Sequence, residues 1–252
     1  MQTAKQKSFL SFNSPEMENE VLLLSLIIAS IGFILWYVFS SSLRLPIRYQ
    51  IMYDANPPYV SRILRRRTLA VLIYALIPLF IIRYTSWVSC ATLQDLNIHF
   101  IWNKEVAMYT MAGVFIALLL SLLTTPKTAS LEIYPELRIR FWRPRILITS
   151  ALSWVMYILA YEFFYRGLLF QSLRFHMNDV LAIAACTALY SLTHYFKLNR
   201  LTTASILYSV AACYVVLRTG SLWPPIITHL VLCLATEWLS IRHHMEMYVR
   251  RT

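Results

Sequence analysis

The sequence predicts an all-α fold, a polytopic membrane helix bundle with about seven transmembrane helices. Composition is the first reason: 58% of the 252 residues are hydrophobic and only 14% are charged. Soluble domains average about 45–50% apolar and about 25% charged residues. The second reason is that the apolar residues gather in separate stretches of helix-spanning length. The third is that the basic residues fall between these stretches in an alternating pattern.

Seven stretches are predicted as spans. A helix rises 1.5 Å per residue, so about 20 mostly apolar residues cross a hydrocarbon core of about 30 Å. The fifth and sixth stretches are short and contain polar residues, so we expect the other helices to shield them. In chain order the predicted spans are residues 21–41, 68–91, 106–124, 146–170, 179–196, 201–217 and 222–241.

The basic residues predict which ends of the helices share a side of the membrane. With seven alternating spans, one side holds 16 of the 23 Lys and Arg residues and the other holds five, while Arg83 and Arg166 lie inside spans. Cytoplasmic loops are enriched in Lys and Arg. We therefore expect an integral, multi-pass protein of a bacterial inner membrane or an organelle membrane. Its N-terminus would lie outside and its C-terminus in the cytoplasm.

The net charge of +11 indicates contact with membrane lipids. In a soluble protein it would suggest nucleic acid, but here the basic residues flank apolar spans, so no nucleic-acid partner is expected. Two juxtamembrane clusters, RILRRRT at residues 62–68 and ELRIRFWRPRI at residues 136–146, are typical of anchors that pair with lipid phosphates. Three regions are predicted: residues 1–145 with three spans and no recognisable motif, residues 146–241 with the polar site, and a cytoplasmic tail at residues 242–252.

Five polar residues stand out because they lie inside predicted spans. A charged side chain near the bilayer centre costs at least about 2.5–3.5 kcal/mol, so such residues usually face a protein interior or a wet cavity. They mark candidate functional positions. The five residues are Glu162, Arg166, His194, His229 and Glu237.

Glu162 and Arg166 are four residues apart, which places them on one helix face where the arginine can pair with the carboxylate. The simplest interpretation is a buried ion pair that orients the helix. The histidines on other spans offer a second one. A buried carboxylate is a suitable general base, and His194 and His229 can polarise a carbonyl, hold an oxyanion or bind a metal. All three side chains could meet at one water molecule.

Three motifs give the chain a resemblance to the CPBP family, which includes CAAX prenyl endopeptidases, Abi-type immunity proteins and lysostaphin-resistance-like proteins. The stretch YEFFYRGLLFQSL at residues 161–173 resembles the family's Glu-Glu-x-x-x-Arg helix. YSLTH at residues 190–194 resembles its aromatic-x-x-x-His helix. RTGSLWPPIITHLVLC at residues 218–233 resembles its third stretch, which ends in His-x-x-x-Asn. The resemblance covers about residues 146–241.

The resemblance implies an all-helical intramembrane protease with its site below the membrane surface. In that family the first glutamate is taken as the base that activates water, while two histidines and the asparagine position the water and stabilise the oxyanion. Glu162, Arg166, His194 and His229 match and are the predicted catalytic residues. This chain departs at Tyr161, in place of the first glutamate, and at Cys233, in place of the asparagine. A phenol with a pKa near 10 is a poor base at neutral pH.

No cofactor is expected, although zinc is a chemical alternative. His229, Cys233 and Glu237 follow one another at spacings of four along one helix face. Together with His194 they could form a site with N, S and O ligands.

Three functions remain open from the sequence. The first is an endopeptidase that hydrolyses a membrane-associated or prenylated peptide. The second is a degenerate relative that keeps the fold but acts without cutting, as a scaffold, peptide-binding or immunity-like protein. The third is a small transporter that relays protons through the same polar residues.

Overall fold

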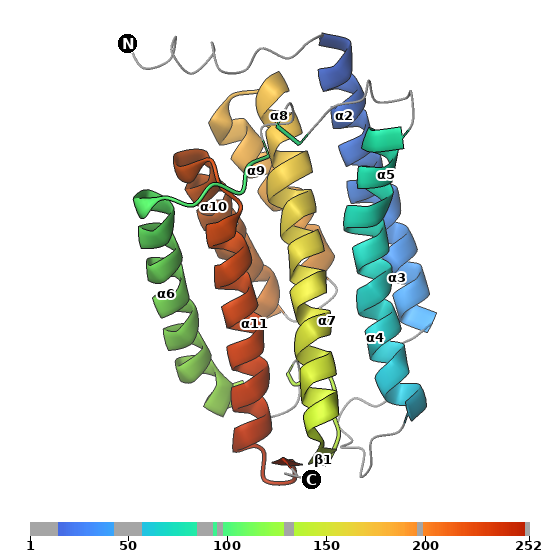
Figure 1. Cartoon of the computed structure of the whole chain (residues 1–252), viewed down its shortest axis with the longest axis vertical. Coiled ribbons are helices and arrows are strands. Elements are labelled where there is room, and N and C mark those ends of the chain that lie inside the picture. Colours follow the sequence, from blue (N-terminus) through green and yellow to red (C-terminus); the bar gives the residue numbers. More distant parts are fainter. Residues whose placement is uncertain are drawn as a thin grey trace.

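The part of the chain that the structure describes is helical apart from one pair of two-residue strands (Figure 1). The computed structural model describes residues 15–42, 57–84, 93–94, 98–128, 134–195 and 199–249. The helices are α2 (Pro15–Ile27), α3 (Phe33–Ser42), α4 (Pro57–Val71), α5 (Ile77–Tyr84), α6 (Lys104–Thr128), α7 (Pro144–Glu162), α8 (Phe170–His176), α9 (Asp179–Tyr195), α10 (Asn199–Thr219) and α11 (Trp223–His243). The π-helical segments η1 (Ile28–Gly32), η2 (Leu72–Leu76) and η3 (Phe163–Leu169) join α2 to α3, α4 to α5 and α7 to α8. The strands are β1 (Phe141–Trp142) and β2 (Tyr248–Val249).

The predicted helical membrane bundle is confirmed. Among the residues that the structure describes, six helices are long and apolar enough to cross a membrane, and they coincide with six of the seven predicted spans. The fifth predicted span is the shorter apolar helix Asp179–His194. The fourth is longer than predicted, because Pro144–His176 runs as one helix of 33 residues through η3. The chain is therefore an integral, multi-pass membrane protein.

Seven spans that alternate in direction place certain loops on the same side of the membrane. Contacts in the structure join loops that this alternation puts together. At one end of the bundle β1 pairs in parallel with β2, so the loop before α7 meets the segment after α11. At the opposite end, the Leu222 N–H donates to the His99 carbonyl over 3.1 Å. The Trp223 Nε1–H also donates to the Phe100 carbonyl over 3.0 Å. Which end faces the cytoplasm stays a prediction.

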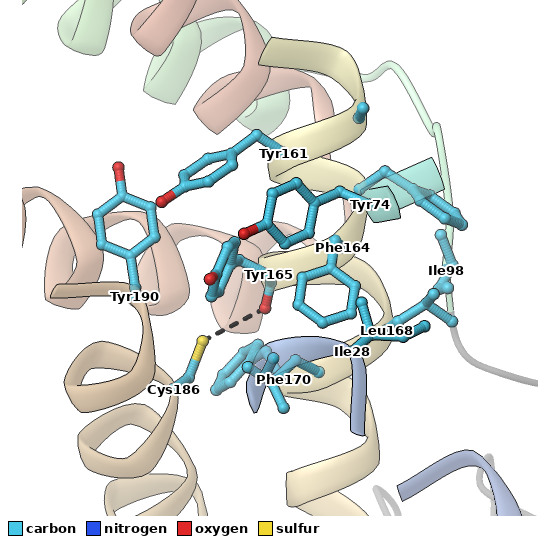
Figure 2. Close-up of a cluster of buried hydrophobic side chains, with 14 of the residues drawn as sticks. Ile28, Tyr74, Ile98, Tyr161, Phe164, Tyr165, Leu168, Phe170, Cys186 and Tyr190 are labelled. Carbon is cyan, nitrogen blue, oxygen red and sulfur yellow. Dashed lines mark hydrogen bonds between the residues drawn. The ribbon is translucent and has the colours of Figure 1, made fainter. Parts of the chain in front are cut away.

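The α7–η3–α8 helix is the central element of the bundle. Every residue from 160 to 173 is buried, so this segment has no face toward lipid or water. Its aromatic residues pack against Tyr74 of η2 and Tyr190 of α9; the ring centroids of Tyr74 and Tyr161, for example, are 5.6 Å apart (Figure 2). Short π-helical insertions occur frequently at functional sites, and η3 contains Arg166.

Proline and glycine set the boundaries of the helices around the site. Pro144 begins α7 and Pro224 follows Trp223 at the start of α11, where a missing backbone N–H costs no helical hydrogen bond. Gly220, with φ of +64°, follows the last residue of α10 and begins the turn to α11 in a backbone conformation that disfavours a side chain. The predicted region boundary near residue 145 stays a prediction. Across it, α6 packs so closely on α11 that a Cβ on Gly113 would lie 2.2 Å from the Thr228 hydroxyl.

Candidate active site

Glu162 connects three helices of the bundle. It is the last residue of α7 and is completely buried. Its Oε1 accepts a hydrogen bond of 2.5 Å from Nδ1 of His229 on α11 and one of 3.2 Å from the hydroxyl of Tyr208 on α10. Its Oε2 lies 3.3 Å from Nε of Arg166. The structure thus brings together three of the four predicted catalytic residues.

Arg166 is completely buried and lies against aromatic rings. Its guanidinium carbon is 4.1 Å from the ring centroid of Tyr190 and 5.3 Å from that of Tyr208. Among the residues that the structure describes, none of its three nitrogens has a hydrogen-bond partner, and neither has Oε2 of Glu162. Buried polar groups are nearly always paired, so unpaired ones need a specific explanation such as bound water. The expected pairing with Glu162 is confirmed as an ionic contact.

His229 is the member of this group that can reach beyond the protein interior. Its side chain is 12% exposed, whereas that of Glu162 is 0% exposed. Because a carboxylate can only accept, Nδ1 of His229 carries the hydrogen of their bond. Its Nε2 is therefore the nitrogen with the lone pair when the ring is neutral. A carboxylate in this position fixes the tautomer and stabilises the protonated ring.

His194 lies near the end of α9 and has different partners. Its Nδ1 is 2.9 Å from the hydroxyl of Thr193 and 3.5 Å from the carbonyl oxygen of Tyr190. Its ring stacks on the Tyr190 ring at 5.3 Å with an interplanar angle of 27°. In the described part of the chain Glu162 makes no hydrogen bond or ion pair with His194. The two imidazoles are thus held by separate partners.

Tyr161 lies between the two histidines. Its ring meets His194 edge to face at 6.5 Å and His229 at 6.2 Å between centroids. Its hydroxyl is 2.6 Å from that of Thr193, and the residue is only 2% exposed. The side chain at the position of the family's first glutamate therefore contacts both predicted histidines.

Cys233 is buried one helical turn beyond His229 and meets a residue from the loop before α7. The hydroxyl of Tyr134 donates to its Sγ over 3.7 Å. Burial raises the pKa of the Tyr134 phenol well above its ordinary value, which keeps this donor protonated. Sequence spacing gave no sign of this contact, because the two residues are 99 positions apart.

Glu237, which the sequence offered as a zinc ligand, lies in a different cluster from Glu162 and His229. Its Oε1 accepts from Ser150 over 2.6 Å and its Oε2 from Trp154 over 2.7 Å. Arg67 lies 3.5 Å from Oε2. Both carboxylate oxygens are therefore already used. Across the described residues, no group of three or more His, Cys, Asp and Glu side chains is arranged to hold a metal ion.

Sequence reasoning missed two residues of the site. Thr193 adjoins a predicted histidine, and a hydroxyl next to an intramembrane histidine was a usable signal. Tyr208 gave no such signal, because it lies 46 positions from Glu162 and reaches it only through the packing of α10 on its neighbours.

A comparison with known families finds a match within this part of the chain. Residues 142–234 match the family described as Type II CAAX prenyl endopeptidase Rce1-like. The match contains all four predicted catalytic residues, and it confirms for this region the resemblance drawn from the motifs. No curated protein and no solved structure matches the chain.

Proposed function

From the Rce1-like domain at residues 142–234, we propose that the chain is an intramembrane endopeptidase that hydrolyses a membrane-associated or lipidated peptide. The observation that carries this proposal is the pair formed by Glu162 and His229, with 2.5 Å between Oε1 and Nδ1. A buried carboxylate that orients an imidazole is a recurring means of making that imidazole a general base.

The proposal changes the roles expected from the sequence. Because Glu162 is completely buried, it orients His229 and does not itself take a proton from water. Nε2 of His229 is the base. Arg166 balances the charge of the carboxylate. Nε2 of His194 is a second hydrogen-bond acceptor for the same water.

The reaction follows from these roles. Nε2 of His229 removes a proton from a water molecule while the water oxygen attacks the carbonyl carbon of the scissile peptide bond. The imidazolium, stabilised by Glu162, then gives this proton to the departing amide nitrogen as the carbon–nitrogen bond breaks. The products are a carboxylic acid and an amine, and the imidazole returns to its neutral form. General acid–base transfer of this kind contributes about 10²- to 10⁴-fold to the rate.

The substrate class rests on the family and on the location of the site. The family description names prenyl endopeptidases. The candidate residues lie within an apolar helix bundle, so a peptide carrying a lipid would be concentrated at the same membrane. We therefore take a prenylated peptide as the first substrate to test.

A second candidate function has a specific observation in its favour. Tyr161 fills the space between His194 and His229, with its ring against both. A phenol there leaves no carboxylate between the imidazoles. The alternative is a relative that binds a lipidated peptide without cutting it, as a scaffold or an immunity-like protein.

Cleavage of a fluorogenic prenylated peptide by the purified chain tests the proposal. The wild type should cleave it, and His229→Gln and Glu162→Gln should each lower kcat by about 100-fold or more. His243→Gln is the matched control, because His243 is exposed at the end of the same helix and its Nδ1 contacts the carbonyl oxygen of Leu239, four residues earlier. A wild type whose cleavage survives His229→Gln would contradict the assigned base.

Tyr161→Glu separates the two candidates. If the wild type binds the peptide uncut and Tyr161→Glu cleaves it, the chain is the non-cutting relative. If the wild type cleaves the peptide and Tyr161→Glu does not raise kcat, the pair of Glu162 and His229 is sufficient for cleavage without a carboxylate at position 161.

A further inference from the structure

We propose that Thr193 is a positioning residue that fixes His194 in the tautomer with hydrogen on Nδ1, so that its Nε2 is a permanent hydrogen-bond acceptor. For its role in the reaction this inference rests on the proposed function. For the state of the histidine it rests only on the hydrogen bonds around Thr193.

The hydroxyl of Thr193 has three partners. It donates to the carbonyl oxygen of Tyr190 over 2.7 Å. It also lies 2.6 Å from the hydroxyl of Tyr161 and 2.9 Å from Nδ1 of His194. A hydroxyl has one hydrogen and two lone pairs. Because its hydrogen is used toward the carbonyl, it must accept from both Tyr161 and His194, and Nδ1 of His194 must carry a hydrogen.

A second partner of His194 leads to the same assignment. Nδ1 is 3.5 Å from the carbonyl oxygen of Tyr190, at the limit of a hydrogen bond. A carbonyl oxygen cannot donate, so this contact is attractive only if Nδ1 is protonated. Both neighbours of Nδ1 are thus acceptors.

Burial and ring stacking hold the His194 ring in the orientation that makes these hydrogen bonds. Thr193 is 8% exposed and Tyr161 is 2% exposed, so water has little room to replace either partner. The ring of His194 stacks on Tyr190 at 5.3 Å. Tyr190 is in turn held beneath the guanidinium of Arg166, 4.1 Å away. The orientation of the His194 ring therefore depends, through Tyr190, on the same arginine that pairs with Glu162.

The two histidines consequently share a tautomer but differ in charge environment. His229 donates its Nδ1 hydrogen to a carboxylate, which stabilises its protonated form. His194 donates to a neutral hydroxyl, which does not. His229 is thus suited to take a proton, and His194 to accept a hydrogen bond and orient the water. Tyr161 completes the arrangement, because its hydrogen bond fills the remaining lone pair of Thr193.

Nitrogen NMR on the full chain in detergent, labelled with ¹⁵N at histidine, tests the assignment directly. His194→Gln identifies the His194 signals by their loss. In the wild type the Nδ1 signal should be that of a protonated nitrogen and the Nε2 signal that of an unprotonated one. Thr193→Val should shift His194 toward the tautomer with hydrogen on Nε2. Thr193→Ser should restore the wild-type signals, and the His229 signals should stay unchanged in both variants.

Two results would overturn the inference. One is a wild-type His194 with hydrogen on Nε2, a result that does not depend on the folding of Thr193→Val. The other is a Thr193→Val protein whose His194 signals equal those of the wild type.

Kinetics add a readout that depends on the proposed function. With the prenylated peptide, Thr193→Val should lower kcat by about tenfold or more with KM little changed, as for other losses of an orienting hydrogen bond. Thr193→Ser should recover most of the rate. If the wild type does not cleave, the proposed function fails while the tautomer measurement still decides this inference.

Discussion

Two clusters in this bundle each pair a buried arginine with glutamate, but they differ in how completely the arginine is hydrogen-bonded. The anchor cluster contains Arg67, Glu136, Ser150, Trp154 and Glu237. The site cluster contains Glu162, Arg166, Tyr208 and His229. Both join several helices, and both lie largely out of contact with solvent.

In the anchor cluster every nitrogen of the arginine is used. Arg67 donates from Nε and Nη2 to Glu136 over 3.0 and 2.8 Å, and from Nη1 to Ser150 and Ser153. Glu136 also pairs with Arg66. Fully paired networks hold elements in one arrangement, and this one fixes the loop before α7 against α4 and α11.

In the site cluster the arginine has an ionic partner but no hydrogen bond among the described residues. Buried polar atoms without a hydrogen-bond partner lower stability, so this cluster is a poor device for holding helices together. We infer that the anchor cluster serves folding, and the proposed function assigns the chemistry to the site cluster.

Arg67→Ala is expected to have the largest effect on stability. It leaves Glu136 and Glu237 without their shared cation, and breaking a buried ion pair typically costs about 3–5 kcal/mol. Thermal unfolding in detergent measures the loss. Arg65→Ala, an exposed position on the same helix, is the control and should change little. If Arg67→Ala and Arg65→Ala unfolded at the same temperature, the structural role assigned to the anchor cluster would be wrong.

Matched amide substitutions should separate the clusters by activity. Glu162→Gln should lower kcat by about 100-fold or more, because the amide disrupts the orientation of His229. Glu237→Gln should leave the activity per folded molecule near that of the wild type while it lowers the unfolding temperature. A parallel loss of activity in both variants would mean that the two clusters act as one.

Arg166→Ala should destabilise the bundle less than Arg67→Ala does, by about 1–3 kcal/mol. It removes the cation beside Glu162, but that carboxylate keeps its bonds from His229 and Tyr208. The double variant Glu162→Gln with Arg166→Met should recover much of the stability, since replacing both charges avoids an unpaired one. It should remain inactive. Unfolding curves and peptide cleavage on the same samples would show whether stability and activity separate in this way.

Chelation should have the smallest effect. The proposed reaction uses His229 as the base, and Glu237 is held in the anchor cluster by Ser150 and Trp154. Cleavage should therefore persist after treatment with EDTA or phenanthroline. Loss of cleavage on chelation, with recovery on adding zinc, would show that a metal takes part.

Part of the site could be predicted from the sequence, because some of its residues are close together along one helix. Glu162 and Arg166 are one turn apart, so their pairing follows from helix geometry. Spacing within one helix does not identify the neighbours of Glu237. Spacing puts it on the face of His229, but two turns along the helix it meets Ser150 and Trp154 of α7 instead.

The sequence by itself determined the helical membrane fold, six of the spans and the family of residues 142–234, because apolar length and motif spacing are properties of consecutive residues. Only the tertiary structure decided that Glu162 meets His229 and Tyr208, that Tyr161 separates the histidines, and that Thr193 bonds His194. These outcomes depend on how each helix is rotated and placed against the others. The rotation is set by the packing of large aromatic side chains from distant parts of the chain, which no short-range pattern in the sequence specifies.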